Sequence, residues 1–261
     1  MHQWYLGTIG FSYKDWLGGF YPPGTSPRTY LQFYSKVFNA VELNTTFHSI
    51  PHKTIVQSWA ASTPAEFKFC VKTPRLITHD LKLMGTQGLM NEFIDAILPI
   101  KGRLGPILIQ FPPSFNQAKI SLLDGFLNNL PQSFQYAVEL RNSSWYTKDT
   151  FQLLSQYHVG WATIDYPNIP KKINLTADFL YIRWIGINNR YHYHSYERED
   201  TTSQLRWWLH EIYSYIDSIP MIYGFFNNDY AGFAAGTCLR FKQLADFTDK
   251  EDHPPFQERL F

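Results

Sequence analysis

The residues Tyr136-Ala137-Val138-Glu139-Leu140-Arg141 form a short apolar run that ends in charged side chains, a pattern that recurs along the chain. Apolar runs of this length are typical of strands buried on both faces of a parallel sheet. Similar runs occur at residues 4–9, 40–44, 67–72, 107–110, 161–165, 180–183 and 221–227. Because segments with helical periodicity separate them, the sequence predicts an α/β fold in which parallel strands alternate with helices.

The length and the number of runs favour one barrel. The chain has 261 residues, close to the roughly 250 of a TIM-type (β/α) barrel. We therefore expect a single domain over residues 1–261 with seven or eight parallel strands. One crossover is expected to be irregular, because no helical pattern lies between Ile164 and Phe179. The charged tail from about residue 248 is expected to pack loosely on the outside of the barrel.

The composition and charge argue against several classes of partner. A formal net charge of +1 gives no general attraction to nucleic acid or to a membrane surface. No apolar stretch approaches the roughly 20 residues of a membrane span. The sequence enters the first strand without a charged segment and an apolar run before it, so we expect no signal peptide. Cys70 and Cys238 lie far apart in apolar surroundings, as expected of free buried thiols in a reducing compartment. We expect a cytoplasmic protein with no membrane partner.

Charged side chains gather where the strands end. Alternate residues of a strand share one face, and the carboxyl ends of barrel strands meet at one mouth. We therefore expect five side chains to line that mouth, those of Glu42, Lys72, Glu139, Arg141 and Arg183. Such a set can bind an anionic substrate and transfer protons. Alternatively, it forms buried ion pairs that hold the top of the barrel together.

Two long loops follow strands and therefore belong to the same face of the barrel. The first, residues 10–25, carries Tyr13 and Trp16 and is expected to fold over the mouth as an aromatic lid. The second, residues 186–202, carries His192 and His194. Alternating histidines can bind a metal, but the spacing reveals no third ligand, so we expect neither a metal nor a cofactor.

Three weaker signals flank other strand ends. Residues 72–75 are basic, which suits a phosphate or a solvated loop, and His79 follows them. Asn44 and Gln110 each end an apolar run. Asn227, Asn228 and Asp229 follow the last run, where they either present polar groups to a ligand or cap the next helix.

Taken together, these residues resemble the domain of unknown function seventy-two family, also called YecE-like. The matching segments come in family order and cover nearly the whole chain: residues 7–16 with 20–22, 42–47, 69–72 with 77–79, 104–113, 137–141 with Trp145, Arg183 with Gly186, and 226–229. The resemblance implies a TIM-type barrel with these segments around its mouth. It implies no settled reaction.

The chain departs from the family pattern at four positions. Relatives usually carry histidine where this chain has Ile185 and Phe233, and often where it has Asn142, whereas His48 stands where a tyrosine is common. A mechanism that needs those three imidazoles does not carry over to this chain. A mechanism built on the carboxylates, the lysine and the arginines does.

We expect a metal-independent hydrolase or lyase that acts on a phosphorylated or polyhydroxylated substrate. Glu139 is the candidate general base or nucleophile, and Glu42 is the second carboxylate. The distance between the two carboxyl groups would decide the role of each. Lys72 is the third candidate catalytic residue, and together with Arg141 and Arg183 it is expected to hold negative charge on the substrate. The remaining candidates for substrate binding are Tyr13, Trp16 and Trp145, by stacking, together with Asn44, Gln110, His79, Asn227, Asn228 and Asp229.

Two alternatives remain open. The chain could be a non-catalytic module for a nucleotide or single-stranded nucleic acid, since aromatic rings beside basic groups are used for both. The near-neutral net charge argues against it, because phosphate contacts dominate such affinity. The chain could also be a degenerate family member that retains a pocket without the chemistry.

Overall fold

The computed structural model describes residues 2–245, which alternate between strands and helices. The strands are β1 (Gln3–Thr8), β2 (Ala40–Leu43), β3 (Lys68–Val71), β4 (Ile107–Gln110), β5 (Tyr136–Glu139), β6 (Gly160–Asp165), β7 (Phe179–Trp184) and β8 (Met221–Phe226). The longer helices are α1 (Tyr30–Val37), α3 (Lys53–Ala61), α4 (Gln87–Ile97), α5 (Ile120–Asn128), α6 (Lys148–Gln156), α7 (Thr202–Tyr213) and α9 (Ala234–Leu244). Two short helices, α2 (Thr45–His48) and α8 (Asn228–Ala231), directly follow strands.

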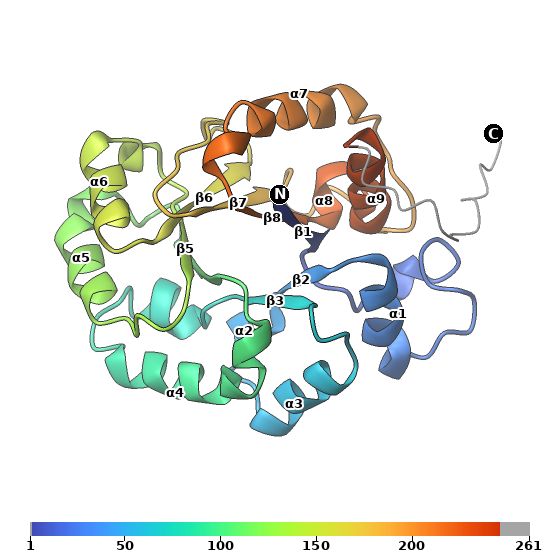
Figure 1. Cartoon of the computed structure of the whole chain (residues 1–261), viewed down its shortest axis with the longest axis horizontal. Coiled ribbons are helices and arrows are strands. Elements are labelled where there is room, and N and C mark those ends of the chain that lie inside the picture. The colour runs from blue at the N-terminus through green and yellow to red at the C-terminus, as the bar shows by residue number, and fades with distance from the viewer. Residues whose placement is uncertain (1, 246–261) are drawn as a thin grey trace.

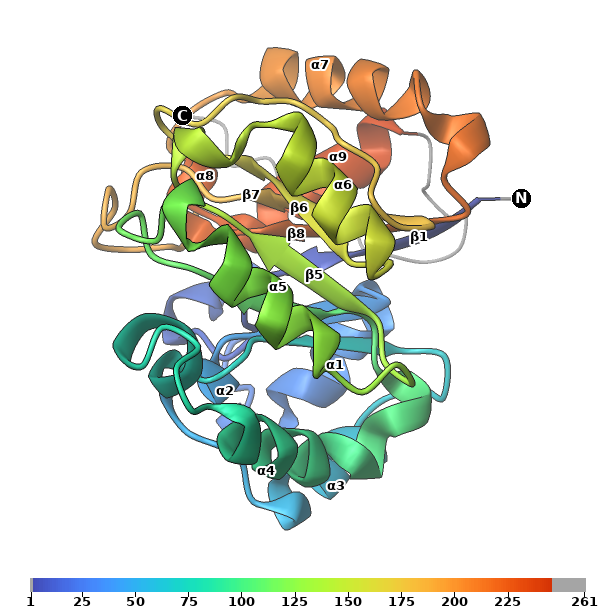
Figure 2. The ribbon, with the colours of Figure 1, turned by 90° about the vertical axis from the view of Figure 1, so that its left-hand side faces the viewer.

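The strands are parallel and follow one another in chain order around a ring. Hydrogen bonds join β1-β8-β7-β6-β5-β4 in one sheet and β2-β3 in another. Parallel bridges from Ile9 to Glu42 and from Lys72 to Leu108 link the two sheets. The helices lie outside the strands (Figure 1), and from the side α5 and α6 cover β5 and β6 (Figure 2). The expected TIM-type barrel is confirmed.

Strand parity separates two apolar layers. Val41, Phe69, Val138 and Ile182 belong to the large cluster between strands and helices. The smaller cluster consists mainly of residues of the opposite parity, Tyr5, Ile9, Ala40, Cys70, Leu108, Ala137, Ala162, Phe179, Tyr181, Ile185, Tyr223 and Phe225. It fills the interior of the barrel, as alternation along each strand requires. Glu42, Lys72, Glu139 and Arg183 continue this inner set toward the carboxyl ends of their strands.

Side chains complete the seam between β1 and β2. The side chain of Asn39 accepts a hydrogen bond from the Leu6 N–H at 2.9 Å and donates to the Trp4 carbonyl at 2.7 Å. Farther along, the Tyr34 hydroxyl accepts from the Thr8 N–H at 2.7 Å and donates to the Ala40 carbonyl at 3.1 Å. These bonds satisfy backbone groups that a continuous ladder would otherwise pair.

The irregular crossover is confirmed, because residues 166–178, all described, contain no helix. Cys70 and Cys238 are free and buried, also as expected. The tail from residue 248 lies outside the described residues. Among residues 2–245, no helix is both long enough and apolar enough to cross a membrane.

The seam predicts the effect of one methyl group. A Cβ at Gly7 would lie 1.9 Å from the Ala40 carbonyl oxygen, which is backbone and cannot move aside cheaply. We expect Gly7→Ala to lower the free energy of unfolding by about 1–3 kcal/mol, as overpacking does. Gly88→Ala is the matched control, because a Cβ there meets nothing within 4 Å. Urea denaturation would measure both; equal stability of Gly7→Ala and wild type would contradict the tight seam.

Candidate functional site

The centre of the site is the guanidinium of Arg183, which binds two carboxylates from other strands. Its Nε and Nη2 donate to Oε2 and Oε1 of Glu42 at 2.8 and 2.7 Å. Its Nη1 donates to Oε2 of Glu139. The three residues come from β7, β2 and β5, and all are buried, with 2 % of Arg183 exposed. This bidentate pairing uses the fork geometry that suits arginine to carboxylates.

Arg141 and Tyr181 occupy the remaining carboxylate positions. The Nε of Arg141 donates to Oε1 of Glu139, and the Tyr181 hydroxyl donates to Oε2 of Glu42 at 2.8 Å. Burial would raise the pKa of Glu139, but the guanidinium groups of Arg141 and Arg183 outweigh it and lower that pKa to about 2. Glu139 is therefore ionised at neutral pH, where it is a weak base and no proton donor.

Lys72 lies beside this network without being paired in it. The residue is 7 % exposed, and its Nζ lies 3.7 Å from the centre of the Phe47 ring. Within residues 2–245, the ammonium forms neither an ion pair nor a hydrogen bond. Burial first and the Arg183 charge second lower the pKa of Lys72 to about 7, although Glu139 and Glu42 oppose them. The amine is thus divided between its charged and neutral forms near pH 7.

His79, like Lys72, contacts the ring of Phe47. It belongs to a single π-helical turn, Leu76–Asp80, and its ring centre is 5.0 Å from that of Phe47. Burial, together with the charges of Lys72 and Arg75, lowers the pKa of His79 to about 4. The imidazole is therefore neutral at neutral pH and adds no charge to the site.

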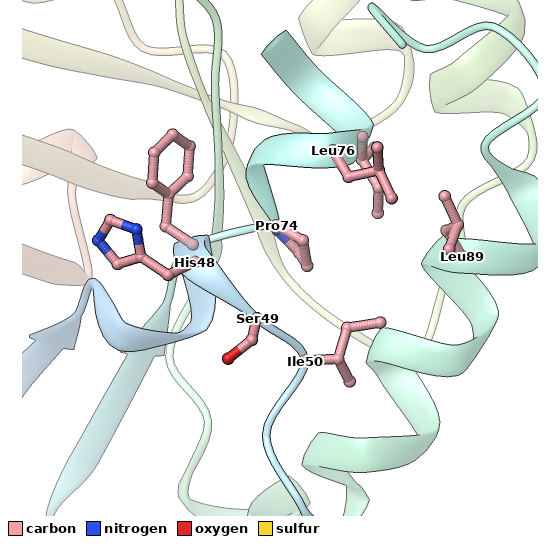
Figure 3. A pocket seen from close by; sticks show the side chains of 8 residues that line it. His48, Ser49, Ile50, Pro74, Leu76 and Leu89 are labelled. Carbon is pink, nitrogen blue, oxygen red and sulfur yellow. The ribbon is translucent and has the colours of Figure 1, made fainter. Parts of the chain in front are cut away.

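An apolar pocket of about 110 Å³ adjoins the site. It is lined by Phe47, His48, Ser49, Ile50, Pro74, Leu76, Ile77 and Leu89. The lining residues come from α2 and the two residues after it, from the segment after β3 and from α4, and Figure 3 labels six of them, including His48, Pro74 and Leu89. Phe47 is common to the pocket and to Lys72, so a free amine and an apolar recess are neighbours.

Asn44 and Gln110 also lie at strand ends. Asn44 is half-buried, and its Oδ1 is enclosed without a hydrogen-bond partner among the described residues. Its neighbour Leu43, the last residue of β2, accepts a bond from the Lys72 N–H at 3.2 Å, so Asn44 directly follows the residue that pairs with Lys72. Gln110 is buried, and its Nε2 donates to the Phe111 carbonyl at 2.5 Å.

The structure does not leave the two predicted stacking tryptophans open to a ligand. Trp16 and Trp145 are both fully buried. The indole N–H of Trp16 donates to Oδ1 of Asn228 at 3.2 Å, and that of Trp145 donates to the Phe115 carbonyl at 2.7 Å. Both rings belong to the core. A tryptophan can be buried there because its indole N–H has a hydrogen-bond partner.

Tyr13 is the aromatic residue of the first loop that lies near the charged network. It is half-buried, and its hydroxyl donates to the Ile9 carbonyl at 2.6 Å. Burial, followed by the charges of Glu42 and Asp229, raises the pKa of Tyr13 to about 12. The phenol is therefore neutral at neutral pH and is held by the end of β1.

The three residues after β8 fasten the surrounding loops. Asn227 accepts from the Asp229 N–H at 3.2 Å, which caps α8. Asn228 accepts from Trp16 and from the Ala234 N–H at 3.0 Å. Asp229 accepts from the Asn189 N–H at 2.9 Å. The sequence left two roles open for this segment, presenting polar groups to a ligand or capping the next helix. These hydrogen bonds favour capping.

Sequence reasoning missed Tyr181 and Phe47. Tyr181 precedes Arg183 by two residues and therefore shares its face of β7, a signal that was available. Phe47 carries no polar group, and only the fold places its ring against Lys72. Among residues 2–245, no group of three or more His, Cys, Asp or Glu side chains converges in a way that could hold a metal ion.

The chain belongs to the family described as "Protein of unknown function DUF72", whose model matches residues 5–259. It is 35% identical over 144 residues to the UPF0759 protein YecE of Escherichia coli K12, which covers 55% of this chain and 50% of YecE. It is 28% identical over 159 residues to the UPF0759 protein YunF of Bacillus subtilis, which covers 57% and 54%. The chain thus matches about half the length of these curated relatives.

Solved structures with the same fold extend over nearly the whole chain. A DUF72 family protein from Thermotoga maritima superposes with a TM-score of 0.81 at 32% identity, covering 94% of this chain and 100% of that one. A second DUF72 family protein, from Enterococcus faecalis, has a TM-score of 0.78 at 20% identity, covering 97% and 98%. The second likeness concerns the fold alone.

The pairing of Arg183 predicts a strong dependence of stability on that side chain. Arg183→Met removes the cation that binds both Glu42 and Glu139 and leaves Glu139 with Arg141 alone, so we expect the free energy of unfolding to fall by roughly 3–5 kcal/mol. The Arg183 charge helps to lower the pKa of Glu139 from 4.5 to about 2. That part of the stabilisation is present at neutral pH and is lost as pH falls from about 4.5 toward about 2, so the deficit of the variant is larger at pH 7 than at low pH.

The matched control is Arg190→Met, because Arg190 pairs with Glu199 on the surface, where 38% and 41% of the side chains are exposed. It is expected to change stability by about 1 kcal/mol or less. Chemical denaturation at several pH values measures both variants. A deficit in Arg183→Met that is equal to the control, or that shrinks as pH rises, would contradict the pairing.

Proposed function

We propose that this DUF72 protein is a metal-independent lyase for a small anionic substrate, with Lys72 accepting a proton and Arg141 binding the anion. The observation that carries the proposal is the state of Lys72, an amine that is buried at the barrel mouth beside a saturated network and has no carboxylate partner there. Catalytic lysines are tuned toward neutrality by burial and by neighbouring cations, and both act here.

The charge balance supports this role for Lys72. Glu42 and Glu139 carry two negative charges, and Arg183 and Arg141 carry two positive ones, so the four groups cancel. A protonated Lys72 then adds a buried positive charge that no negative charge balances. Either loss of its proton or binding of an anion removes this imbalance. A lyase with an anionic substrate would bind the anion in one step and use the neutral amine as a base in the next.

Arg141 is suited to bind that anion. Only its Nε is engaged, by Glu139, while its Nη1 and Nη2 form no hydrogen bond with the described residues. Its guanidinium packs over the Tyr166 ring at 4.8 Å, and 13% of the side chain is exposed. A planar fork with two free nitrogens at the edge of a site matches a carboxylate or a phosphate.

The same geometry favours a lyase over a glycoside hydrolase. Glycoside hydrolysis by two carboxyl groups needs one of them protonated, as the acid. The low pKa of Glu139, near 2, removes it from that role. Glu42 is bound at both oxygens by Arg183 and at one by Tyr181. The general-base role expected for Glu139 from the sequence therefore passes to Lys72.

The nucleic-acid alternative has less support. Stacking of bases needs aromatic faces that are open beside basic groups. Of the three candidates for such faces, Trp16 and Trp145 are enclosed in the core. Tyr13 is half-buried, and its hydroxyl is held by the Ile9 carbonyl. We therefore give preference to a small substrate.

Turnover assays test the proposal. The full chain would be incubated with small hydroxy acids, sugar acids and sugar phosphates, and newly formed carbonyl groups would be detected with semicarbazide. We expect activity that persists in EDTA, with a kcat/KM that rises with pH through about 7 as Lys72 loses its proton. We expect Lys72→Met to lower kcat/KM by about 100-fold or more, and Arg141→Met to act mainly through a higher KM.

The matched control is Lys101→Met. Lys101 also lies over an aromatic ring, 5.1 Å from that of Phe134, but it is exposed and outside the site. It is expected to retain wild-type activity. Wild-type rates in Lys72→Met would refute the role of the amine, and loss of activity in EDTA that added metal restores would refute metal independence.

A further inference from the structure

We infer that the Lys72 amine is a covalent nucleophile, which forms an imine with the carbonyl carbon of a short oxo acid or a small phosphorylated ketone. This inference deepens the proposed function and rests on it. It goes further because a proton acceptor needs no bond to the substrate, whereas an imine fixes the substrate class as a carbonyl compound that carries an anionic group.

The backbone around Lys72 is fixed on both sides. Its N–H donates to the Leu43 carbonyl at 3.2 Å, and its carbonyl accepts from the Thr46 hydroxyl at 2.7 Å. The following N–H, of Thr73, donates to the Leu108 carbonyl at 2.9 Å. The base of the side chain therefore cannot shift, and its terminal nitrogen is the part without a polar partner in the described chain. A nucleophile needs this combination of a rigid base and an unengaged reactive atom.

A lysine with only a structural role would be expected to pair with a carboxylate, because a buried ammonium without a partner is costly. Two carboxylates are at hand, but Arg183 holds both, and Arg141 and Tyr181 fill further positions on them. The arrangement thus keeps Lys72 unpaired next to groups that could have paired it. Unpaired, the amine has its lone pair available near neutral pH.

The anionic substrate balances the charge of the covalent product. A protonated imine carries a positive charge, which Arg183 opposes and Glu139 and Glu42 favour at the position of Lys72. The anionic end of the substrate supplies the negative charge that the four paired groups do not. Burial disfavours the free ammonium mainly because it loses its water, which a larger, less strongly hydrated iminium loses at lower cost. The site therefore accepts the charge when it develops on the substrate.

The covalent step balances without an oxidant or a reductant. The Nζ lone pair attacks the carbonyl carbon, and a proton moves from nitrogen to oxygen, which gives a neutral carbinolamine. Its hydroxyl takes up a proton from solvent and leaves as water, and the protonated imine remains. The electron pair of an adjacent C–C or C–H bond then moves into the protonated imine and gives an enamine. In the first case the departing fragment leaves as an aldehyde whose hydroxyl proton passes to water, and in the second case the proton itself passes to water. Protonation of the enamine and hydrolysis by one water release the product and restore the amine.

The surroundings of Phe47 limit the shape of the substrate. The apolar pocket in Figure 3 shares Phe47 with the amine, so it can receive a short apolar end of a molecule bound at Lys72. Arg141, whose charge also acts on Lys72, offers its two free nitrogens to the anionic end. A short chain with a carbonyl between an anion and a small apolar end fits this layout.

Trapping with cyanoborohydride tests the inference directly on the full chain. The probes are pyruvate, 2-oxobutanoate and dihydroxyacetone phosphate, with acetone as the probe that lacks an anion. Intact mass and peptide mapping would locate the reduced adduct. We expect one adduct, at Lys72, formed at least about tenfold faster than at any other lysine because of the lowered pKa. We expect slower labelling by acetone and in Arg141→Met.

Two variants make the result decisive. Lys72→Met is expected to give no fast adduct, and Lys101→Met is expected to label like wild type. No adduct on the wild type, equal rates at all lysines, or the same fast adduct in Lys72→Met would overturn the imine. If Lys72→Met abolishes turnover while the wild type forms no adduct, the imine fails but the proton-acceptor function stands. If Lys72→Met changes neither turnover nor labelling, both fail.

Discussion

The pairing of Arg183 with Glu42 and Glu139 is the interaction on which the rest of the site depends. One guanidinium, 2% exposed, joins β7 to β2 and β5 across the interior of the barrel. Buried charges are tolerated only when they are paired and hydrogen-bonded, and the pairing often contributes less to stability than to a single arrangement of the groups. By engaging both carboxylates, Arg183 leaves Lys72 as the group whose charge is free to change.

The strands and the inward direction of the charged residues could be predicted from the sequence. Alternation along a strand has a period of two, so Glu139 and Arg141 had to share a face, and the ends of parallel strands had to meet. The barrel and its irregular crossover followed from the same patterns. The residue pattern within each segment determines these features, so each segment can be interpreted without knowing its neighbours in space.

The pairing within the site could not be predicted. Arg183 and Glu42 are 141 residues apart, and which cation binds which carboxylate depends on the register of strands across the barrel. From the sequence, Glu139 was therefore expected to be the general base or nucleophile. Lys72 was counted among the catalytic residues, but as a group that holds negative charge on the substrate. The predicted stacking role of Trp16 and Trp145 was wrong for a related reason. The sequence of a loop does not show whether an aromatic residue in it is exposed or packs into the core.

The titration of the Lys72 amine tests the central claim most directly. Lysine labelled with ¹³C at Cε would be incorporated, the Lys72 resonance would be assigned by its loss in Lys72→Met, and chemical shifts would be followed by NMR from about pH 5 to about pH 11. We expect Lys72 to titrate near its pKa of about 7, about three units below the roughly 10.4 of an unperturbed lysine. A Lys72 resonance that titrates near that unperturbed value would contradict the proposed role of the amine.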